Sequence, residues 1–369
     1  MPKTVQPLRV LILGGTGFIG PHFVDAAVAA GHSVAVFNRG ASVADLPEGV
    51  ERLQGDRASG DYASIRDRDW DVAIDLAVYD PEWVTSLGEA MAGRIAKYVY
   101  LSSMSVYEND DSAPVRNELS PLKQPLSREV PLEADSPWDQ VFALPFHLQR
   151  MYFDRYGLNK QYAEIEAEKY FPGRTISIRP HCLVAPGDNS NHLYWYERIL
   201  KGGEVLVPGD PTDGFQLIDV RDMASWTIQL VEDGEAGIFN CVSPDLSDPI
   251  AWGDYIDQIG RTADNGARLT WVSSKWLLDE GVAQHLLPLW FPYPDRQASE
   301  TLEWTAFNYE NTKAVEHGLT YRPWQESVAD TVEWARTTST GLPEGWGISP
   351  DLESKLLSKW HAETADKKG

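Results

Sequence analysis

Residues 9–20 read Arg-Val-Leu-Ile-Leu-Gly-Gly-Thr-Gly-Phe-Ile-Gly, and this stretch decides the fold. Its first five residues form a short, mostly apolar run, which predicts a strand buried on both faces, as in a parallel sheet. Glycines at 14, 17 and 20 follow at once, and residues 21–30 have a helical pattern. Glycines at this junction permit a tight turn and let the backbone approach a pyrophosphate, while the helix amino terminus supplies N–H donors. The stretch therefore predicts a β-α-β unit that binds a dinucleotide.

Further apolar runs extend this unit into a sheet, with helical segments such as residues 81–93 and 148–169 between them. Strands that alternate with helices imply right-handed crossovers and a doubly wound sheet. The predicted strands are residues 33–37, 72–76, 98–101, 175–179 and 237–242. We therefore predict an α/β fold, a Rossmann doubly wound parallel sheet with a smaller carboxyl-terminal α/β substrate domain.

Two regions break this rhythm. Residues 109–145 contain six prolines and many acidic residues, which predicts an irregular excursion that serves either as a lid or as surface decoration. Residues 252–304 show mixed helical patterning, and we expect their tryptophans at 271, 276, 290 and 304 to form the core of the second domain. The expected units are a dinucleotide-binding domain (1–182 plus about 215–245), a substrate-binding domain (about 183–214 plus 246–337) and a carboxyl-terminal tail (338–369).

The composition limits the possible partners. With 55 acidic and 32 basic residues, the 369-residue chain has a net charge of −23, which repels phosphate backbones and anionic lipid. We expect no nucleic-acid partner and no membrane partner. Cys182 and Cys241 are too few for a disulfide framework and are expected to be buried, and the scattered histidines predict no metal site. The amino terminus lacks a leader pattern, so we expect a cytoplasmic protein.

The end of the second predicted strand bears on the choice of cofactor. It reads Val-Phe-Asn-Arg-Gly and places Asn38 and Arg39 where an NAD site usually has an acidic residue for the ribose 2′-hydroxyl. An amide beside a guanidinium suits a 2′-phosphate better, so the sequence favours NADP(H), with NAD(H) as the alternative. Asp56, which precedes the strand at residues 72–76, is a candidate contact for adenine.

A second set of residues could move protons. The strand at residues 98–101 runs into Ser102-Ser103, and downstream Tyr156 and Lys160 have the i, i+4 spacing that places them on one helix face. A free tyrosine has a pKa near 10, and both an ammonium and a cationic nicotinamide would favour its phenolate. A serine at the strand end can hydrogen-bond the reacting oxygen.

Two neighbouring features are interpreted as structural. Tyr309 and Lys313 repeat the tyrosine–lysine spacing, but they lie far past the predicted strands and no serine-rich strand end precedes them. Glu164 follows Lys160 by one turn and is expected to form an ion pair.

In this order the motifs resemble the extended short-chain dehydrogenase/reductase superfamily, NAD-dependent epimerase/dehydratase family, over roughly residues 8–335. The motifs are Gly14–Gly20, Ser102-Ser103-x-x-Val106-Tyr107, Tyr156-Gly157-x-x-Lys160-x-x-x-Glu164, Arg179-Pro180 with Pro186-Gly187-Asp188, Ile218–Ala224, and Phe239-Asn240. The resemblance implies that Ser103 is the active-site hydroxyl and Tyr156 the acid/base. It also implies that Lys160 holds the nicotinamide ribose and lowers the pKa of the tyrosine.

The resemblance and the patterns together give the expected contacts. Those with the cofactor are Gly14, Thr16, Gly17, Phe18, Ile19, Gly20, Asn38, Arg39, Asp56, Leu76, Ala77, Ser102 and Pro180. Those with the substrate are Met104, His181, Asn191, His192 and Arg268. Arg198, Lys201 and Arg268 are candidate partners of a substrate diphosphate.

The sequence also departs from the family pattern. Met104 and Ser105 stand where the sugar-nucleotide dehydratases have Asp-Glu, which argues against 4,6-dehydration. Asp75 stands where the family usually has histidine, and we expect it to change how the cofactor ribose or pyrophosphate is held. The endings around Asn38 and Asp75 resemble a branch that includes plant plastid RNA-binding proteins without catalytic residues, but this chain keeps the serine, tyrosine and lysine, and its charge opposes RNA.

We therefore expect an NAD(P)-dependent oxidoreductase or epimerase that acts on a secondary alcohol or ketone, in the first instance of a nucleotide sugar or related polyol. One alternative is an NADPH-dependent ketoreductase of a non-sugar metabolite. A second is a non-catalytic regulatory protein that binds dinucleotide. By analogy with the family, the helices at residues 81–93 and 148–169 would form a homodimer.

Overall fold

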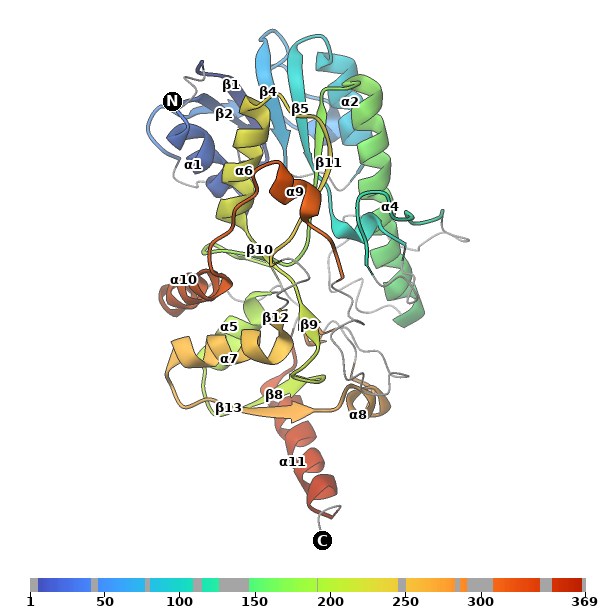
Figure 1. The fold of residues 1–369 in the computed structure, drawn as a ribbon, viewed down its shortest axis with the longest axis vertical. Helices are drawn as coiled ribbons and strands as arrows, with labels where there is room; N and C mark the ends of the chain where they lie inside the picture. Colours follow the sequence, from blue (N-terminus) through green and yellow to red (C-terminus); the bar gives the residue numbers. More distant parts are fainter. Residues whose placement is uncertain are drawn as a thin grey trace.

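The computed structural model describes residues 6–40, 46–76, 80–108, 115–125, 146–190, 192–244, 250–282, 286–290, 308–338 and 347–366, with the backbone alone for 146–153. A seven-stranded sheet forms its upper half in Figure 1, in the order β11-β6-β5-β4-β1-β2-β3. Every pair of neighbouring strands is parallel. The strands are β1 (Arg9–Leu13), β2 (Ser33–Asn38), β3 (Glu51–Gln54), β4 (Trp70–Asp75), β5 (Ile95–Leu101), β6 (Thr175–Pro180) and β11 (Gly237–Cys241). The predicted doubly wound parallel sheet is confirmed.

The edge strand β3 is absent from the sequence-based prediction. Its four residues, Glu-Arg-Leu-Gln, are exposed or half-buried, because β3 has a neighbour on one side only. An exposed edge strand carries charges instead of an apolar run, so its sequence lacks the signal that marks the buried strands.

Helices cover both faces of the sheet (Figure 1). On one face, α1 (Gly20–Ala29) packs against α6 (Val220–Glu232), and on the other, α2 (Glu82–Met91) packs against α4 (Phe146–Tyr170). Each face has its own apolar core, with Phe23 and Met223 in the first and Leu87 and Ala163 in the second. Layers on both faces bury the central strands, which accounts for their near-continuous apolar sequences.

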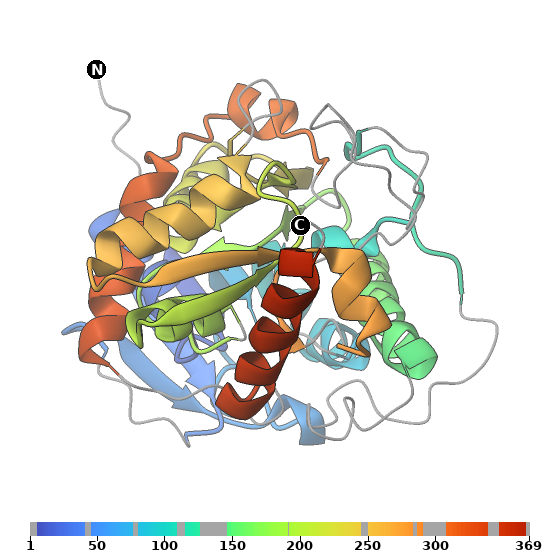
Figure 2. The same ribbon diagram turned by 90° about the horizontal axis from the view of Figure 1, so that it is seen from below.

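A third core fills the lower half. The short parallel ladder of β8 (Glu204–Pro208) and β13 (Arg268–Val272) crosses the middle of Figure 2, behind helix α11. The other elements are α5 (Leu193–Leu200), α7 (Trp252–Ala263), α8 (Ser274–Asp279), α10 (Trp324–Thr337), α11 (Pro350–Asp366) and the two-residue strands β7 (Leu183–Val184), β9 (Gly214–Phe215), β10 (Ile218–Asp219) and β12 (Ile250–Ala251). Trp290 is buried in this core, and Trp271 and Trp276 pack against it partly buried, as predicted. Trp304 lies outside the described residues.

Two segments lie elsewhere than the predicted domains placed them. Helix α11 comes from the expected tail, yet Leu356 and Leu357 are buried in the third core and Glu353 forms a 2.8 Å ion pair with Arg198. Helix α9 (Thr312–Glu316), expected in the substrate domain, packs on the sheet through Ala314. The position of each segment is determined by apolar contacts with residues far away in the sequence, and the sequence alone does not reveal these contacts.

Three expectations from composition can be compared with the structure. Both cysteines are buried and free, as predicted. Within the described ranges, no helix is long and apolar enough to cross a membrane. Within the same ranges, no three His, Cys, Asp or Glu side chains gather in a group that could hold a metal ion.

Candidate cofactor and active site

The glycine-rich turn between β1 and α1 is shaped for close approach. Gly14 has φ 92°, a conformation that side chains disfavour, and its N–H donates to the carbonyl of Phe37 at 3.2 Å. A Cβ on Gly20 would lie 2.5 Å from the Cα of Gly15, so the turn and the first residue of α1 can pack only without a side chain there. A Cβ on Gly17 would meet nothing within 4 Å. The turn is therefore tightly packed at Gly20 and has free space at Gly17. A diphosphate bound at a helix amino terminus requires such space.

The end of β2 lies beside this turn. Asn38 Nδ2 donates to Thr16 Oγ1 at 3.3 Å, and Asn38 Oδ1 accepts the N–H of Gly40 at 2.8 Å. Arg39 is exposed, and its carbonyl accepts a 3.2 Å hydrogen bond from Gln54. The amide acceptor of Asn38 is thus already occupied where a ribose 2′-hydroxyl would need an acceptor.

The other predicted cofactor residues surround the carboxyl ends of the strands. Asp56 caps the 3-10 helix η1 (Arg57–Ser59) by accepting the N–H of Ala58 at 3.1 Å. Leu76 is buried and donates its N–H to Leu13 at 3.1 Å. Phe18 and Ile19 pack partly buried against the α1 face, Pro180 ends β6, and Ala77 lies outside the described residues.

A buried ion pair below this edge was missed by sequence reasoning. Asp75 is fully buried and accepts two bonds from Arg57, at 2.7 and 2.6 Å, and a third from the hydroxyl of Tyr98 at 2.6 Å. The Arg57 guanidinium also lies 5.1 Å from the ring centroid of Trp83. Burial disfavours its charge, but Asp75 more than compensates and raises the pKa of Arg57 above its ordinary value. Both oxygens of Asp75 are thus engaged within the protein, and its expected effect on how the cofactor ribose or pyrophosphate is held stays a prediction.

The predicted serine, tyrosine and lysine lie near the end of β5. Ser103 caps the 3-10 helix η2 (Met104–Val106), with its Oγ accepting the N–H of Ser105 at 3.1 Å. A Cβ on Gly157 would lie 2.0 Å from the carbonyl oxygen of Ser105, so α4 rests directly on η2. This close packing brings the helix that carries Tyr156 and Lys160 against the turn that carries Ser103.

Lys160 is held in one place. Its Nζ donates to the carbonyl of Leu101 at 2.8 Å and lies 5.2 and 5.8 Å from the ring centroids of Tyr100 and Tyr156. Burial lowers the pKa of Lys160 to about 8, although Asp75 favours its charged form. The side chain is therefore mainly an ammonium at neutral pH and sits one helical turn from the half-buried Tyr156.

A buried polar network supports this arrangement. Glu164 forms an ion pair as expected, but its partner is Arg179 of β6, at 2.8 and 2.6 Å. Arg179 also donates to the hydroxyl of Tyr107 at 2.9 Å, and that hydroxyl donates to Asn240 Oδ1 at 2.6 Å. The network connects α4, β6, η2 and β11 beneath the site, which fixes their relative positions.

The predicted substrate residues are only partly brought together. His181 follows β6, its Nδ1 accepts the N–H of Cys182 at 2.9 Å, and burial lowers its pKa to about 3, with a smaller contribution from His192. His192, at the start of α5, has Nδ1 3.4 Å from the carbonyl of Leu183. Met104 is buried in η2, and Asn191 lies outside the described residues.

Two predicted cations lie elsewhere. Arg268 is exposed at the start of β13 and paired with Glu204 at 2.7 Å, in the outer ladder of the lower half. Arg198 is paired with Glu353 and also donates to two backbone carbonyls. Both residues are engaged by acidic side chains of the lower half, and their role as partners of a substrate diphosphate stays a prediction.

The second tyrosine–lysine pair has separate roles. Lys313 donates to the carbonyl of Ile238 at 2.6 Å and lies 4.3 Å from the centroid of Phe239, so it is structural, as expected. The ring centroid of Tyr309 lies 5.8 Å from that of Tyr107 and 5.4 Å from that of His181. Tyr309 thus adjoins the predicted substrate side, and nothing in its sequence context indicates this.

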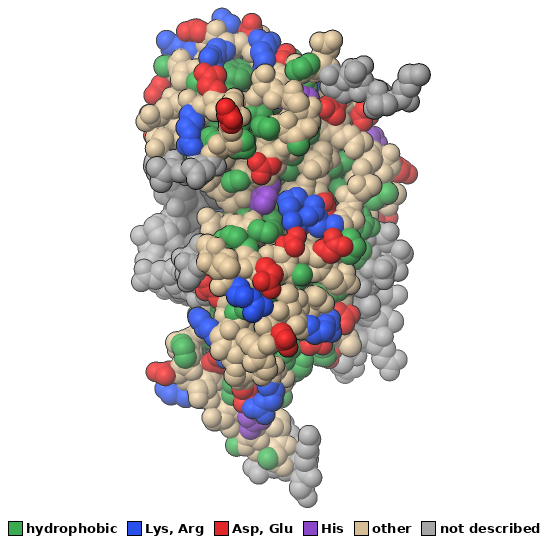
Figure 3. All heavy atoms as spheres, turned by 90° about the vertical axis from the view of Figure 1, so that its left-hand side faces the viewer, with side chains coloured by type: hydrophobic (Ala, Val, Ile, Leu, Met, Phe, Trp, Pro, Cys, Tyr) green, Lys and Arg blue, Asp and Glu red, His purple; other side chains and the backbone are tan. Residues whose placement is uncertain are grey.

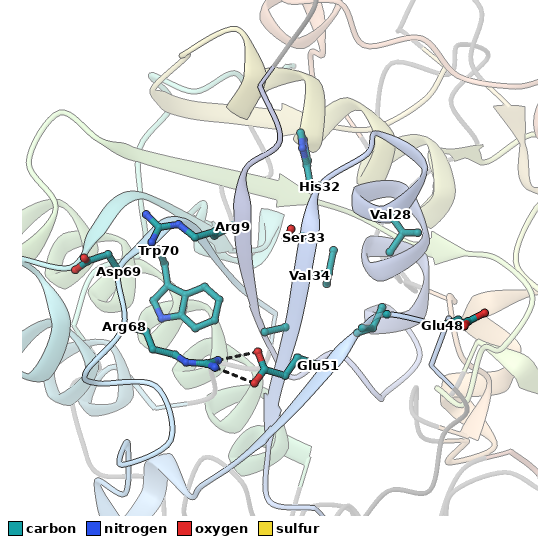
Figure 4. A pocket seen from close by; sticks show the side chains of 13 residues that line it. Arg9, Val28, His32, Ser33, Val34, Glu48, Glu51, Arg68, Asp69 and Trp70 are labelled. Atoms are coloured by element: carbon teal, nitrogen blue, oxygen red, sulfur yellow. Dashed lines mark hydrogen bonds and ion pairs between the residues drawn. The ribbon is translucent and has the colours of Figure 1, made fainter.

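A hollow of about 590 Å³ lies at the amino-terminal ends of the strands (Figure 4). It is lined by the first residues of four strands, Arg9, Ser33, Glu51 and Trp70. Its bidentate ion pair between Arg68 and Glu51 is at 2.7 and 2.9 Å. Ligands of open parallel sheets bind at the carboxyl ends of the strands, so we place the functional site at the glycine turn and not in this hollow.

Residues 10–128 match the family model of the NAD dependent epimerase/dehydratase family. The chain is 25% identical over 253 residues to an Arabidopsis thaliana protein, "Chloroplast stem-loop binding protein of 41 kDa b", over 63% of this chain and 58% of that protein. It is 36% identical over 110 residues to a 2'-dehydrokanamycin reductase of Streptomyces kanamyceticus, over 29% of this chain and 31% of the reductase. The matched region is thus less than two thirds of the length of either relative.

Solved epimerase structures share the fold. A UDP-glucose 4-epimerase has a TM-score of 0.64 at 15% identity, over 90% of this chain and 99% of its own. A Methanobrevibacter ruminantium UDP-N-acetylglucosamine 4-epimerase, in complex with UDP-N-acetylmuramic acid, has a TM-score of 0.62 at 16% identity with the same coverage. Bordetella bronchiseptica WbmH, in complex with NAD+, has a TM-score of 0.62 at 14% identity, over 90% and 100%. Residues 10–128 therefore match the model of the NAD dependent epimerase/dehydratase family, and the chain shares the Rossmann fold of these solved structures.

Proposed function

We propose that the protein is an NAD(P)-dependent oxidoreductase or epimerase in which Tyr156 exchanges a proton with a secondary alcohol or ketone. The observation that carries this proposal is the buried amine of Lys160, fixed by Leu101 one turn from Tyr156, on a helix that rests on the turn of Ser103. The open side of the glycine turn fits a dinucleotide at the same edge of the sheet.

Each side chain has a defined part in this chemistry. A bound nicotinamide supplies the hydride transfer. Tyr156 takes the proton from the substrate hydroxyl in oxidation and returns it in reduction. The Lys160 ammonium stabilises the phenolate form of Tyr156, because an opposite charge nearby lowers the pKa of a phenol. Ser103 Oγ donates to Ser105 Oγ at 3.1 Å, and we propose that it turns this hydroxyl toward the reacting oxygen when the substrate binds.

We propose NADP(H) as the preferred cofactor. The acceptor of Asn38 is occupied by Gly40, and Arg39 at the end of β2 offers an exposed cation to a 2′-phosphate. Three solved structures that share the fold are complexes with NAD, so NAD(H) stays the alternative.

The substrate proposal is a nucleotide sugar, which is supported by the substrates named for the solved epimerases. A second candidate, an NADPH-dependent ketoreductase of another metabolite, is favoured by one specific observation. Arg198 and Arg268, the cations expected to hold a diphosphate, are both engaged by acidic residues in the lower half. The reductase from Streptomyces kanamyceticus points in the same direction.

A non-catalytic function is the less favoured proposal. The Arabidopsis relative is named for stem-loop binding, but this chain carries a net charge of −23. On the face drawn in Figure 3, Lys and Arg side chains are interspersed with Asp and Glu, whereas nucleic-acid binding proteins gather their cations into a patch. We therefore expect no binding of a stem-loop RNA in an electrophoretic shift assay at physiological salt.

The proposed homodimer would use α2 and α4. On α4, Tyr162 and Ile165 are 42% and 54% exposed although both are large and apolar, which suits a helix that packs against a second copy. Light scattering on the purified protein would show twice the mass of the chain, and Ile165→Glu should convert the dimer to a monomer.

The direct test of function starts with the purified protein. Denaturation followed by mass and absorbance measurements identifies and counts any released dinucleotide. Near-stoichiometric NAD+ would support an epimerase with internal redox chemistry, while an empty protein that binds NADPH tightly would support a reductase. A protein that holds and binds neither would contradict the proposal.

A further inference from the structure

The buried ion pair of Arg57 and Asp75 lies next to the amine of Lys160. Asp75 ends β4 and is in register with Tyr100 of β5, so the two side chains project from the same face of the sheet. Helix α4 covers this face, and Lys160 Nζ lies 5.2 Å from the Tyr100 ring centroid. Asp75, Tyr100 and Lys160 therefore lie on the same side of the sheet, with Tyr100 next to both.

Few groups besides this pair carry charge near the amine. The charged groups that act on Lys160 are Asp75 from β4, Arg57 from η1 and Glu164 from its own helix. The rings of Tyr100 and Tyr156 lie beside its amine. The charge of Glu164 is balanced by Arg179. The hydroxyl of Tyr100 is buried and, within the described part of the chain, has no hydrogen-bond partner. Charges act more strongly on one another at buried positions than in water.

Resting on the proposed function, we propose that Asp75 and Arg57 are positioning residues that set the protonation of Lys160, and through it the alkaline limit of the reaction. Asp75 favours the ammonium, and Arg57 opposes it. Tyr98 fixes the carboxylate of Asp75 by its 2.6 Å hydrogen bond.

The proposal predicts an effect that a general loss of structure would not produce. Asp75→Asn and Arg57→Gln break the same ion pair and remove the same contacts, so both should destabilise the protein. Their effects on Lys160 have opposite signs, because one variant removes a negative and the other a positive charge. A nearby charge shifts a pKa by about one unit or more. We therefore expect the pKa of Lys160 to fall by about one unit in Asp75→Asn and to rise by about one unit in Arg57→Gln.

The measurement is the NMR titration of Lys160 in the intact protein without substrate, with lysine labelled with carbon-13 at Cε and the signal assigned by its loss in Lys160→Arg. Lys169, exposed on the same helix, is the internal reference. Arg68→Gln is the matched control variant. It removes the bidentate ion pair of Arg68 with Glu51, which lies at the amino-terminal ends of the strands, and should leave the pKa of Lys160 unchanged. Circular dichroism checks that each variant is folded.

Shifts of opposite sign would support the proposal, with the alkaline limb of the pH–rate profile moving in the same directions. Shifts of the same sign, or none in either variant, would overturn it. If Asp75→Asn does not fold, Arg57→Gln/Asp75→Asn must titrate about one unit below Arg57→Gln, and equal values would overturn the proposal too. The titration needs no turnover, so a wild-type protein without activity would refute the proposed function and leave this result standing.

Discussion

Replacing Gly157 with alanine should separate the two parts of the proposed active site. The added Cβ would lie 2.0 Å from the carbonyl oxygen of Ser105 and 2.8 Å from its carbonyl carbon. These are backbone atoms that cannot rotate away, so α4 must move away from η2 by more than 1 Å to reach ordinary contact at about 3.4 Å. Overpacking of this kind costs about 1–3 kcal/mol of unfolding free energy.

The effect on activity should exceed the effect on stability. The displaced helix carries Tyr156 and Lys160, and η2 carries Ser103, so a movement of about 1 Å could lower kcat about 100-fold. The assays are urea unfolding and steady-state kinetics. The matched control is Gly260→Ala in α7, where a Cβ would meet nothing within 4 Å, and this variant should gain about 0.5–1 kcal/mol without a change in kcat. If Gly157→Ala matched the control in both assays, the packing of α4 on η2 would not position the site.

Three further predictions follow from the same geometry. Arg39→Ala should weaken the binding of NADPH about tenfold or more, because it removes a charge-assisted contact, and should leave the binding of NADH unchanged. Equal losses of affinity for both dinucleotides in isothermal titration would contradict the proposed role of Arg39. Arg179→Met leaves Glu164 buried without its partner and should cost about 3–5 kcal/mol in urea unfolding, while Glu164→Gln/Arg179→Met should recover most of it; an unaffected single variant would refute the network. Lys160, whose pKa is lowered to about 8, should lose its proton as the pH rises through that value, so activity should fall there. The unfolded chain still binds that proton up to the ordinary pKa of 10.5, so the contribution of Lys160 to stability should instead rise between pH 8 and 10.5, and thermal melts of wild type and Lys160→Met would show it.

The sequence predicted those features whose signals are local. The glycines from 14 to 20 show the turn because a close approach of backbone segments excludes side chains, and the apolar runs show strands buried on both faces. The i, i+4 spacing of Tyr156 and Lys160 is likewise a local property of one helix. Edge strand β3 was not predicted because an exposed edge strand has no apolar run.

Features that depend on the order of the strands in the sheet could not be predicted from the sequence. Arg57 and Asp75 are 18 residues apart, and they meet only because η1 follows the edge strand and folds back over the end of β4. The same reason explains Arg179 and Glu164, which join β6 to α4. Arg268 was placed in the substrate pocket from its position after β11, but the side of the lower half that it occupies is set by the pairing of β13 with β8.

The central claim is that Tyr156, supported by Lys160, moves the proton in a dinucleotide-dependent reaction. The most direct test compares wild type with Tyr156→Phe for dinucleotide affinity and for conversion of a panel of UDP-sugars and ketones, followed by chromatography of the products. The account predicts that Tyr156→Phe binds the dinucleotide like wild type and loses turnover by about 10²–10⁴-fold, the usual contribution of a general acid or base. Turnover at the wild-type rate in Tyr156→Phe would contradict it.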